Sequence, residues 1–142
     1  MDARREVKFR PARLADLAAI AAIQAASPEA AQWNPVDYLK HDCRVAEVNS
    51  CVAGFLVTRQ VGPGEREILN LAVDPAERRK GIARRLLEDA LSNAPGAWFL
   101  EVRASNAAAI RLYESAGFER AGRRSGYYRE PAEEAIVMRI FS

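Results

Sequence analysis

The chain is predicted to fold as a mixed α/β domain, on three observations. Its 142 residues are a usual length for one domain. Hydrophobic residues make up 49% of the sequence and charged residues 28%, which is enough apolar material for a core. Apolar residues recur with a period of two in some segments and at helical spacing in others, in the order β-α-α-β-β-β-α-β-α-β-β. No repeat, linker or low-complexity tail interrupts this order, so we expect a single domain over residues 1–142.

The first elements are a short strand and two helices. Alternation of apolar and charged residues over 7–10 predicts the strand. From Leu14, apolar residues at helical spacing predict a helix that Pro28 ends. An Asn-Pro pair, typical of a helix start, predicts a second, short helix over residues 33–39.

Three strands are predicted next. Residues 44–48 and 52–60 are strand-like and flank Asn49-Ser50, which predicts a hairpin turn. The Gly-Pro-Gly segment at 62–64 is the clearest loop of the chain. The apolar run at 68–73 predicts a buried central strand.

The last part of the chain alternates helices and strands. Residues 81–92 form an amphipathic helical pattern, and residues 97–102 are an apolar strand. A further helix is expected to begin after Asn106, a good N-cap, and to end at Gly117. Two final runs predict a strand pair, residues 118–128 and 135–140.

Composition excludes several classes of protein. No window approaches the roughly 18 apolar residues of a membrane span, and the first residues lack the apolar core of a signal peptide. We therefore expect a cytoplasmic protein without a membrane partner. Two cysteines, Cys43 and Cys51, do not make a disulfide scaffold, and a single histidine, His41, argues against a zinc site. No metal is expected.

A dense basic cluster stands out in a chain whose net charge is only +2; it comprises Arg78, Arg79, Lys80, Arg84 and Arg85. Gly81, at the start of the predicted helix, would let the backbone approach a ligand, and helix N-termini attract anions. The cluster therefore indicates a local anion such as a phosphate ester, although a solvated basic helix start is an equally good interpretation. A nucleic-acid partner is not expected, because the cluster is short and lacks interleaved aromatic residues.

Two segments of the sequence resemble the Gcn5-related N-acetyltransferase (GNAT) superfamily. NLAVDPAERRKGIARRLLEDAL contains its acyl-CoA signature, Arg/Gln-x-x-Gly-x-Gly/Ala, with Ala83 in place of the second glycine. LEVRASNAAAIRLYESAGF resembles the strand and helix that follow, and looks closest to the RimI group, which acetylates the N-terminal alanine of a ribosomal protein. The ending is similar too, at Arg124, Tyr127-Tyr128 and residues 134–138. The motifs cover about residues 67–140, and residues 1–66 match only in layout.

The resemblance implies a GNAT fold and acetyl-CoA as cosubstrate. The implied sheet is mixed, mostly antiparallel, of about seven strands flanked by helices, with a splayed central strand pair. Backbone groups of the central strand would bind the acetyl and pantetheine portion, the basic loop would hold the pyrophosphate, and an asparagine would contact the pantetheine arm. The residues so implied are Leu71, Ala72 and Val73; Arg78, Arg79, Lys80, Gly81, Ile82, Ala83 and Arg84; and Asn106. The alternative for Asn106 is a helix N-cap alone.

The resemblance also implies two catalytic residues. Glu101 matches the general base that takes a proton from the incoming amine, and Tyr113 matches the acid that protonates the sulfur of coenzyme A. As alternatives, Glu101 forms a structural pair with Arg103 or another arginine, and Tyr113 fills core space. Glu67 is a rival base, placed by simple alternation on the same strand face as Leu69 and Leu71.

The acceptor is expected to be a protein N-terminus, such as that of a ribosomal protein. An α-amine titrates near 8 and a lysine near 10.4, so the α-amine offers more neutral nucleophile at neutral pH. Trp33, Tyr127 and Tyr128 are candidate acceptor contacts, with core or cross-strand packing as the alternative. A small-molecule amine or lysine acetyltransferase, or a non-catalytic acyl-CoA-binding module, are the alternative functions. The sequence leaves the oligomeric state open.

Overall fold

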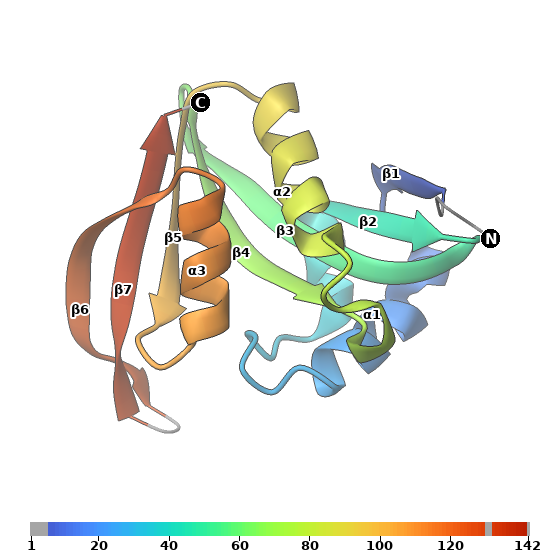
Figure 1. The fold of residues 1–142 in the computed structure, drawn as a ribbon, viewed down its shortest axis with the longest axis horizontal. Coiled ribbons are helices and arrows are strands. Elements are labelled where there is room, and N and C mark those ends of the chain that lie inside the picture. Colours follow the sequence, from blue (N-terminus) through green and yellow to red (C-terminus); the bar gives the residue numbers. More distant parts are fainter. Residues whose placement is uncertain (1–5, 130–131, 142) are drawn as a thin grey trace.

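The computed structural model describes residues 6–129 and 132–141, and within them one seven-stranded sheet runs through the molecule (Figure 1). Its strand order is β1-β2-β3-β4-β5-β7-β6. Neighbouring strands are antiparallel except β4 and β5, which are parallel. The strands are β1 (Val7–Pro11), β2 (Asp42–Val48), β3 (Cys51–Gly62), β4 (Glu65–Val73), β5 (Ala97–Arg103), β6 (Glu119–Arg129) and β7 (Ala132–Phe141). The predicted mixed, mostly antiparallel sheet is confirmed.

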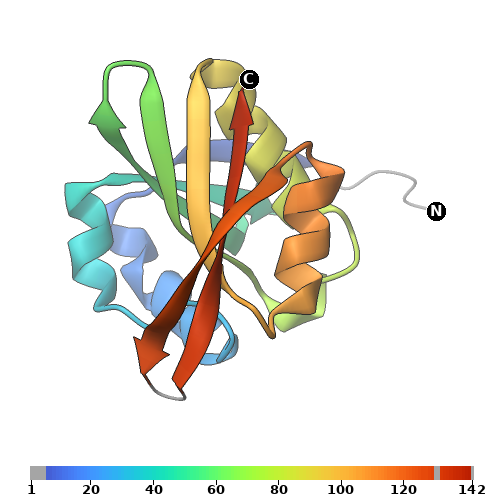
Figure 2. The ribbon, with the colours of Figure 1, turned by 90° about the vertical axis from the view of Figure 1, so that its left-hand side faces the viewer.

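Helices cover both faces of this sheet (Figure 2). One face packs against α1 and the 3-10 helix η2, and the other against α2 and α3. The helical elements are η1 (Leu14–Asp16), α1 (Leu17–Ala25), η2 (Pro35–Lys40), η3 (Pro75–Glu77), α2 (Ile82–Asn93) and α3 (Ala107–Ser115). Within the residues that the structure describes, no helix has both the length and the apolar content that a membrane span requires.

The order of elements predicted from the sequence is confirmed, with local differences. The second helix is a 3-10 helix, and Asn34 caps it by accepting a hydrogen bond from Val36 N–H at 3.3 Å. Asn49 and Ser50 both have left-handed backbone conformations, with φ of +52° and +67°. Two consecutive positive φ angles are what a two-residue hairpin turn between twisted strands requires.

A β-bulge interrupts β4 at Leu69. Thr58 of β3 pairs with Ile68, but the next residue of β3, Val57, pairs with Asn70, so Leu69 is the additional residue. A bulge shifts the alternation of side chains along the strand that carries it. Leu69 and Asn70 consequently follow each other on the face that α1 covers.

The bulge corrects one expectation from the sequence. Leu69 packs against the cluster formed with α1, whereas Leu71 packs against the cluster formed with α2 and α3. The prediction that Glu67, Leu69 and Leu71 share one strand face is therefore wrong for Leu71. Uninterrupted alternation would have placed all three side chains on one face. The additional residue at position 69 exchanges the two faces for the residues that follow it.

β4 and β5 separate at the bulge. Among the described residues their parallel pairing covers four residue pairs and ends with Ile68 and Leu100. Beyond this point β5 pairs with β7 as far as Arg103, while β4 continues to Val73 along β3. The predicted splayed central pair is thus confirmed, and it opens the middle of the sheet.

A polar network fixes β1 to the start of the first helix. Arg10 donates hydrogen bonds to both carboxylate oxygens of Asp16, at 2.7 and 2.9 Å, and to Glu47 of β2 at 2.7 Å. Asp16 is buried and also accepts from the backbone N–H of Arg13 at 2.7 Å. The bond from Arg10 is the main cause that holds the pKa of Asp16 below its usual value.

We expect Asp16→Asn to lower the free energy of unfolding at pH 7 by about 1–3 kcal/mol, because a buried charge-assisted pair is broken. Because the pKa of Asp16 is lowered in the folded state, its contribution is complete above the unfolded value and is lost as the pH falls through the folded value. The difference between variant and wild type should therefore shrink below about pH 4. Urea unfolding across this pH range measures it. Asp37→Asn, at an exposed pair with Lys40, should change stability little at any pH.

Candidate active site

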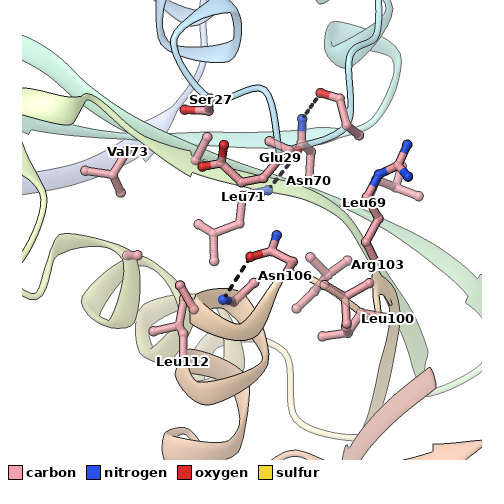
Figure 3. A pocket seen from close by; sticks show the side chains of 18 of the residues that line it. Ser27, Glu29, Leu69, Asn70, Leu71, Val73, Leu100, Arg103, Asn106 and Leu112 are labelled. Carbon is pink, nitrogen blue, oxygen red and sulfur yellow. Dashed lines mark hydrogen bonds between the residues drawn. The ribbon is translucent and has the colours of Figure 1, made fainter. Parts of the chain in front are cut away.

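A cavity of about 510 Å³ opens where β4 and β5 separate (Figure 3). Its walls come from the ends of both strands, from α3, from the start of α2, and from the loop between α1 and η2, residues 26–34, here called the α1–η2 loop. Its volume lies within the range of small-molecule sites. The cavity is therefore the first candidate for the functional site.

The end of the cavity nearest α2 has the backbone geometry of an anion site. Gly81 is the N-cap of α2 and adopts a left-handed conformation, with φ of +79°, and Arg79 does the same at +66°. The first N–H groups of a helix have no partner within it, and Gly81 brings no side chain to cap them. These N–H groups and the positive end of the helix dipole can hold a phosphate.

The basic side chains of this loop are distributed over several partners. Arg78 reaches into the cavity wall, where it donates to Ser27 Oγ at 2.9 Å and to the carbonyl oxygen of Val73 at 3.3 Å. Lys80 pairs with Glu77, and Arg84 with Glu88, while Arg85 lies over the Phe9 ring. All five basic residues are near the start of α2, and their expected contact with a pyrophosphate stays a prediction. Ile82 is buried in the core.

Four residues expected at the pantetheine arm line the cavity, Leu71, Ala72, Val73 and Asn106, and Ala83 joins them from α2. The oxygen of the Asn106 side chain accepts a hydrogen bond from Ala109 N–H at 3.2 Å, so it caps α3. Its amide faces the cavity from the side opposite β4 (Figure 3). Capping and lining are therefore compatible for this asparagine.

Glu101 lines the cavity from β5 and lies against an arginine of β6. Arg124 Nη1 donates to both carboxylate oxygens, at 2.9 and 3.0 Å, and 14% of the Glu101 side chain is exposed. Arg103 instead pairs with Glu133 at 3.3 Å. Of the two possibilities for a structural pair of Glu101, Arg103 or another arginine, this ion pair is an example of the second. The pair keeps a carboxylate at the cavity wall.

Tyr113 lines the same cavity from α3. Its ring packs edge-on against Phe118, with 5.6 Å between ring centroids, and the residue is buried. Tyr113 therefore packs in the core and lines the cavity at the same time.

Glu67 lies elsewhere. It is not among the described residues that line the cavity, and its carboxylate pairs with Arg59 of β3 at 2.7 Å. Glu101 and Tyr113 thus line one cavity, whereas Glu67, the rival base, lies on β4 outside the lining of this cavity.

The predicted acceptor contacts are placed only in part. Trp33 lines the cavity from the α1–η2 loop, with 41% of the residue exposed, and stacks on Tyr38. Tyr127 and Tyr128 belong to β6, but their side chains lie outside the described residues.

Sequence reasoning missed most of the α1–η2 loop and one strand residue. Ser27, Glu29 and Gln32 line the cavity from the loop, and Asn70 does so from β4. The loop residues have no motif, because irregular backbone positions them. Asn70 did carry a signal, since a polar side chain inside the apolar run ILNLAV needs a buried partner.

A mixed sheet whose parallel pair opens beside a helix N-terminus is the architecture that the resemblance to N-acetyltransferases implied. Residues 14–118 match the sequence profile of the acetyltransferase (GNAT) family, and the chain belongs to that family. Among the residues that the structure describes, no group of three or more His, Cys, Asp or Glu side chains could hold a metal ion.

Relatives and solved structures agree with this assignment. The chain is 44% identical over 88 residues to the N-alpha-acetyltransferase RimI of Mycobacterium tuberculosis, covering 61% of this chain and 56% of the relative. It is 44% identical over 98 residues to the [ribosomal protein bS18]-alanine N-acetyltransferase of Escherichia coli, covering 65% and 66%. The aligned parts thus span less than two thirds of these curated relatives.

Over almost the whole fold, the structure resembles the crystal structure of the ribosomal-protein-S18-alanine N-acetyltransferase from Escherichia coli. The TM-score is 0.81 at 32% identity, covering 96% of this chain and 94% of that chain. The similarity to the GNAT superfamily and to its RimI group, predicted from the sequence, is confirmed.

Proposed function

We propose that this chain transfers the acetyl group of acetyl-CoA to the N-terminal α-amine of a protein. The observation that carries the proposal is the cavity at the strand separation, whose lining includes a carboxylate, Glu101, and a phenol, Tyr113, beside the N-terminus of α2. The E. coli relative acts on alanine of ribosomal protein bS18, by its name, which supports a ribosomal protein as the acceptor here.

The residues present fit acetyl-CoA. The open N-terminus of α2, with its left-handed Gly81, suits the pyrophosphate. A Cβ built at Gly81 meets no protein atom within 4 Å, so the space above it is open for a ligand. The cavity, which Arg78 and Ala83 line near this helix start, lies between β4 and α3. It suits an extended arm with amide groups, because residues of β4 and the Asn106 amide line it.

The chemistry requires a neutral amine, a thioester carbonyl and a proton for the departing sulfur. Glu101 takes a proton from the acceptor ammonium, directly or through water, and the amine attacks the carbonyl carbon. The carbon–sulfur bond then breaks, and the Tyr113 hydroxyl donates a proton to the thiolate. The attacking nitrogen loses its second proton in the same collapse, and that proton restores the Tyr113 phenol directly or through water. The products are the N-acetylated chain and coenzyme A. The pKa of the thiol is near that of a free cysteine, about 8.5, so even a hydrogen bond from the phenol helps the thiolate to leave.

An α-amine suits this site better than a lysine. Its pKa near 8 leaves about one tenth of it neutral at pH 7, whereas a lysine at 10.4 is almost fully charged. Trp33 and the α1–η2 loop border the open side of the cavity, where a chain end could enter.

We expect acetylation of peptides with a free N-terminus and none of matched peptides with a blocked N-terminus and one lysine. Intact mass after incubation with acetyl-CoA measures the transfer. Modification of the blocked peptides would identify a lysine acetyltransferase instead. Binding of acetyl-CoA with no peptide product, but with transfer to polyamines or amino acids, would identify a small-molecule acceptor.

A further inference from the structure

Asn70 is a buried polar residue at the point where β4 bulges and leaves β5. It is 6% exposed and lines the cavity. Its amide nitrogen donates to the carbonyl oxygen of Ala31 and to the hydroxyl of Tyr38, both at 2.9 Å, and its oxygen accepts from Leu71 N–H at 3.0 Å. The amide nitrogen also lies 3.5 Å from Gln24 Oε1. A buried amide whose nitrogen and oxygen are both hydrogen-bonded is tightly oriented.

These bonds connect the two sides of the site. Leu71 belongs to the strand whose backbone is proposed to bind the acetyl end of acetyl-CoA, and Ala31 belongs to the α1–η2 loop on the acceptor side. The connection continues beyond Tyr38, whose hydroxyl bonds to Gln24 Oε1. The amide nitrogen of Gln24 then donates to the carbonyl oxygen of Trp33 at 2.6 Å.

The bulge is what makes this connection possible. In regular alternation the residue after Leu69 would point to the face of α2 and α3. The additional residue turns Asn70 to the face of α1 and η2 instead, where it meets Tyr38. The irregularity that aims the Asn70 amide at the α1–η2 loop thus lies directly beside the point where the pairing of β4 with β5 ends.

We propose that Asn70 is a positioning residue, which holds the α1–η2 loop at a fixed distance from the thioester and so sets the acceptor amine against the carbonyl carbon. This inference rests on the proposed acetyl transfer. Misplacement of a reacting group by about 1 Å can lower a rate by about 100-fold. Asn70 touches neither reactant in this account and acts through the α1–η2 loop.

Asn70→Ala is expected to lower kcat/KM for an accepted peptide at least ten-fold and to leave the Kd of acetyl-CoA within about two-fold. Tyr38→Phe removes one partner of Asn70 but keeps the ring stacked on Trp33. It should therefore also lower kcat/KM for the peptide relative to the affinity for acetyl-CoA, but by less than Asn70→Ala does. Steady-state kinetics and calorimetric titration measure both quantities. A parallel loss in peptide turnover and acetyl-CoA affinity would overturn the proposal, because it indicates general damage.

Thr58→Val is the matched control. Thr58 is equally buried in the same sheet, its hydroxyl accepts from Arg66 at 2.8 Å, and it does not line the cavity. This variant should lower Tm without altering the ratio of peptide kcat/KM to acetyl-CoA affinity. If Thr58→Val changes this ratio as much as Asn70→Ala does, Asn70 has no special role.

Fluorescence of Trp33 gives a second readout that needs no acceptor. The other tryptophan, Trp98, is buried, so iodide quenching reports mainly on Trp33. Asn70→Ala should increase quenching, because the loop loses its anchor. Unchanged quenching would overturn the inference. A wild-type protein that acetylates no peptide would instead refute the proposed function, and quenching would still decide whether Asn70 holds the loop.

Discussion

Glu101→Gln should lower kcat by about 10²–10⁴-fold while the Kd of acetyl-CoA stays within a few-fold, because an amide cannot take a proton from the acceptor ammonium. The substitution keeps the shape of the side chain and one acceptor oxygen for Arg124. Arg124 is 54% exposed, so its reduced pairing should cost little stability. Single-turnover rates at saturating acetyl-CoA, together with titration calorimetry, separate the chemical step from binding.

Glu67→Gln is a closely matched control for this prediction. The two glutamates have nearly the same side-chain exposure, 13% and 14%. Glu67 forms an ion pair with Arg59, and Glu101 forms one with Arg124. They differ in that Glu101 lines the cavity. Glu67→Gln is therefore expected to keep kcat within about three-fold of wild type. If Glu67→Gln abolishes turnover and Glu101→Gln is nearly silent, the assignment of the base is wrong.

The ion pair between Glu101 and Arg124 also shapes the reaction. Arg124 donates to both carboxylate oxygens of Glu101, so an ammonium that contacts this carboxylate directly must share it with the guanidinium. The acceptor ammonium is itself a cation that can take over part of the pairing as it enters. Proton transfer through water is consistent with this arrangement, because it needs no displacement of Arg124.

The sequence predicted the elements because most of them carry a local signal. The caps at Asn34 and Asn106 and the turn at Asn49-Ser50 were recognisable from residue type, and their hydrogen bonds or positive φ angles are present. The bulge at Leu69 was not predictable in this way. Helices cover both faces of β4, so apolar residues occur on both sides of this strand. The alternation of apolar and polar residues that would reveal a bulge is therefore absent.

The candidate site was predictable where a motif places its residues on regular elements. Glu101 and Tyr113 lie on β5 and α3 at one cavity, in agreement with the block of sequence that suggested them. Which of Glu101 and Glu67 lines the cavity was not predictable from the pattern, because both lie in apolar strands. The assignment of the base stays a prediction. Arg124 became a partner of Glu101 only through the strand order β5-β7-β6, in which β7 lies between the two strands that carry them.

Tyr113→Phe is expected to lower kcat by about 100-fold or more and to leave folding nearly intact. The phenylalanine ring can keep the edge-on contact with Phe118 and the place of Tyr113 in the core. Loss of one hydroxyl costs stability by about 1 kcal/mol. The rate falls because the departing thiolate loses its proton donor. Without the phenol it must leave unprotonated or take a proton from water.

The loss of kcat in Tyr113→Phe should depend on the thiol that leaves. A comparison of two thioesters therefore distinguishes a role of Tyr113 in acid catalysis from a role in packing. For an acetyl thioester of an aromatic thiol, whose pKa lies well below that of coenzyme A, departure needs little help from an acid. The ratio of wild-type to Tyr113→Phe rates should then fall toward one, measured at equal acceptor concentration. A ratio that stays equally large for both thioesters would mean that Tyr113 serves the geometry of the cavity, and another group would have to protonate the sulfur.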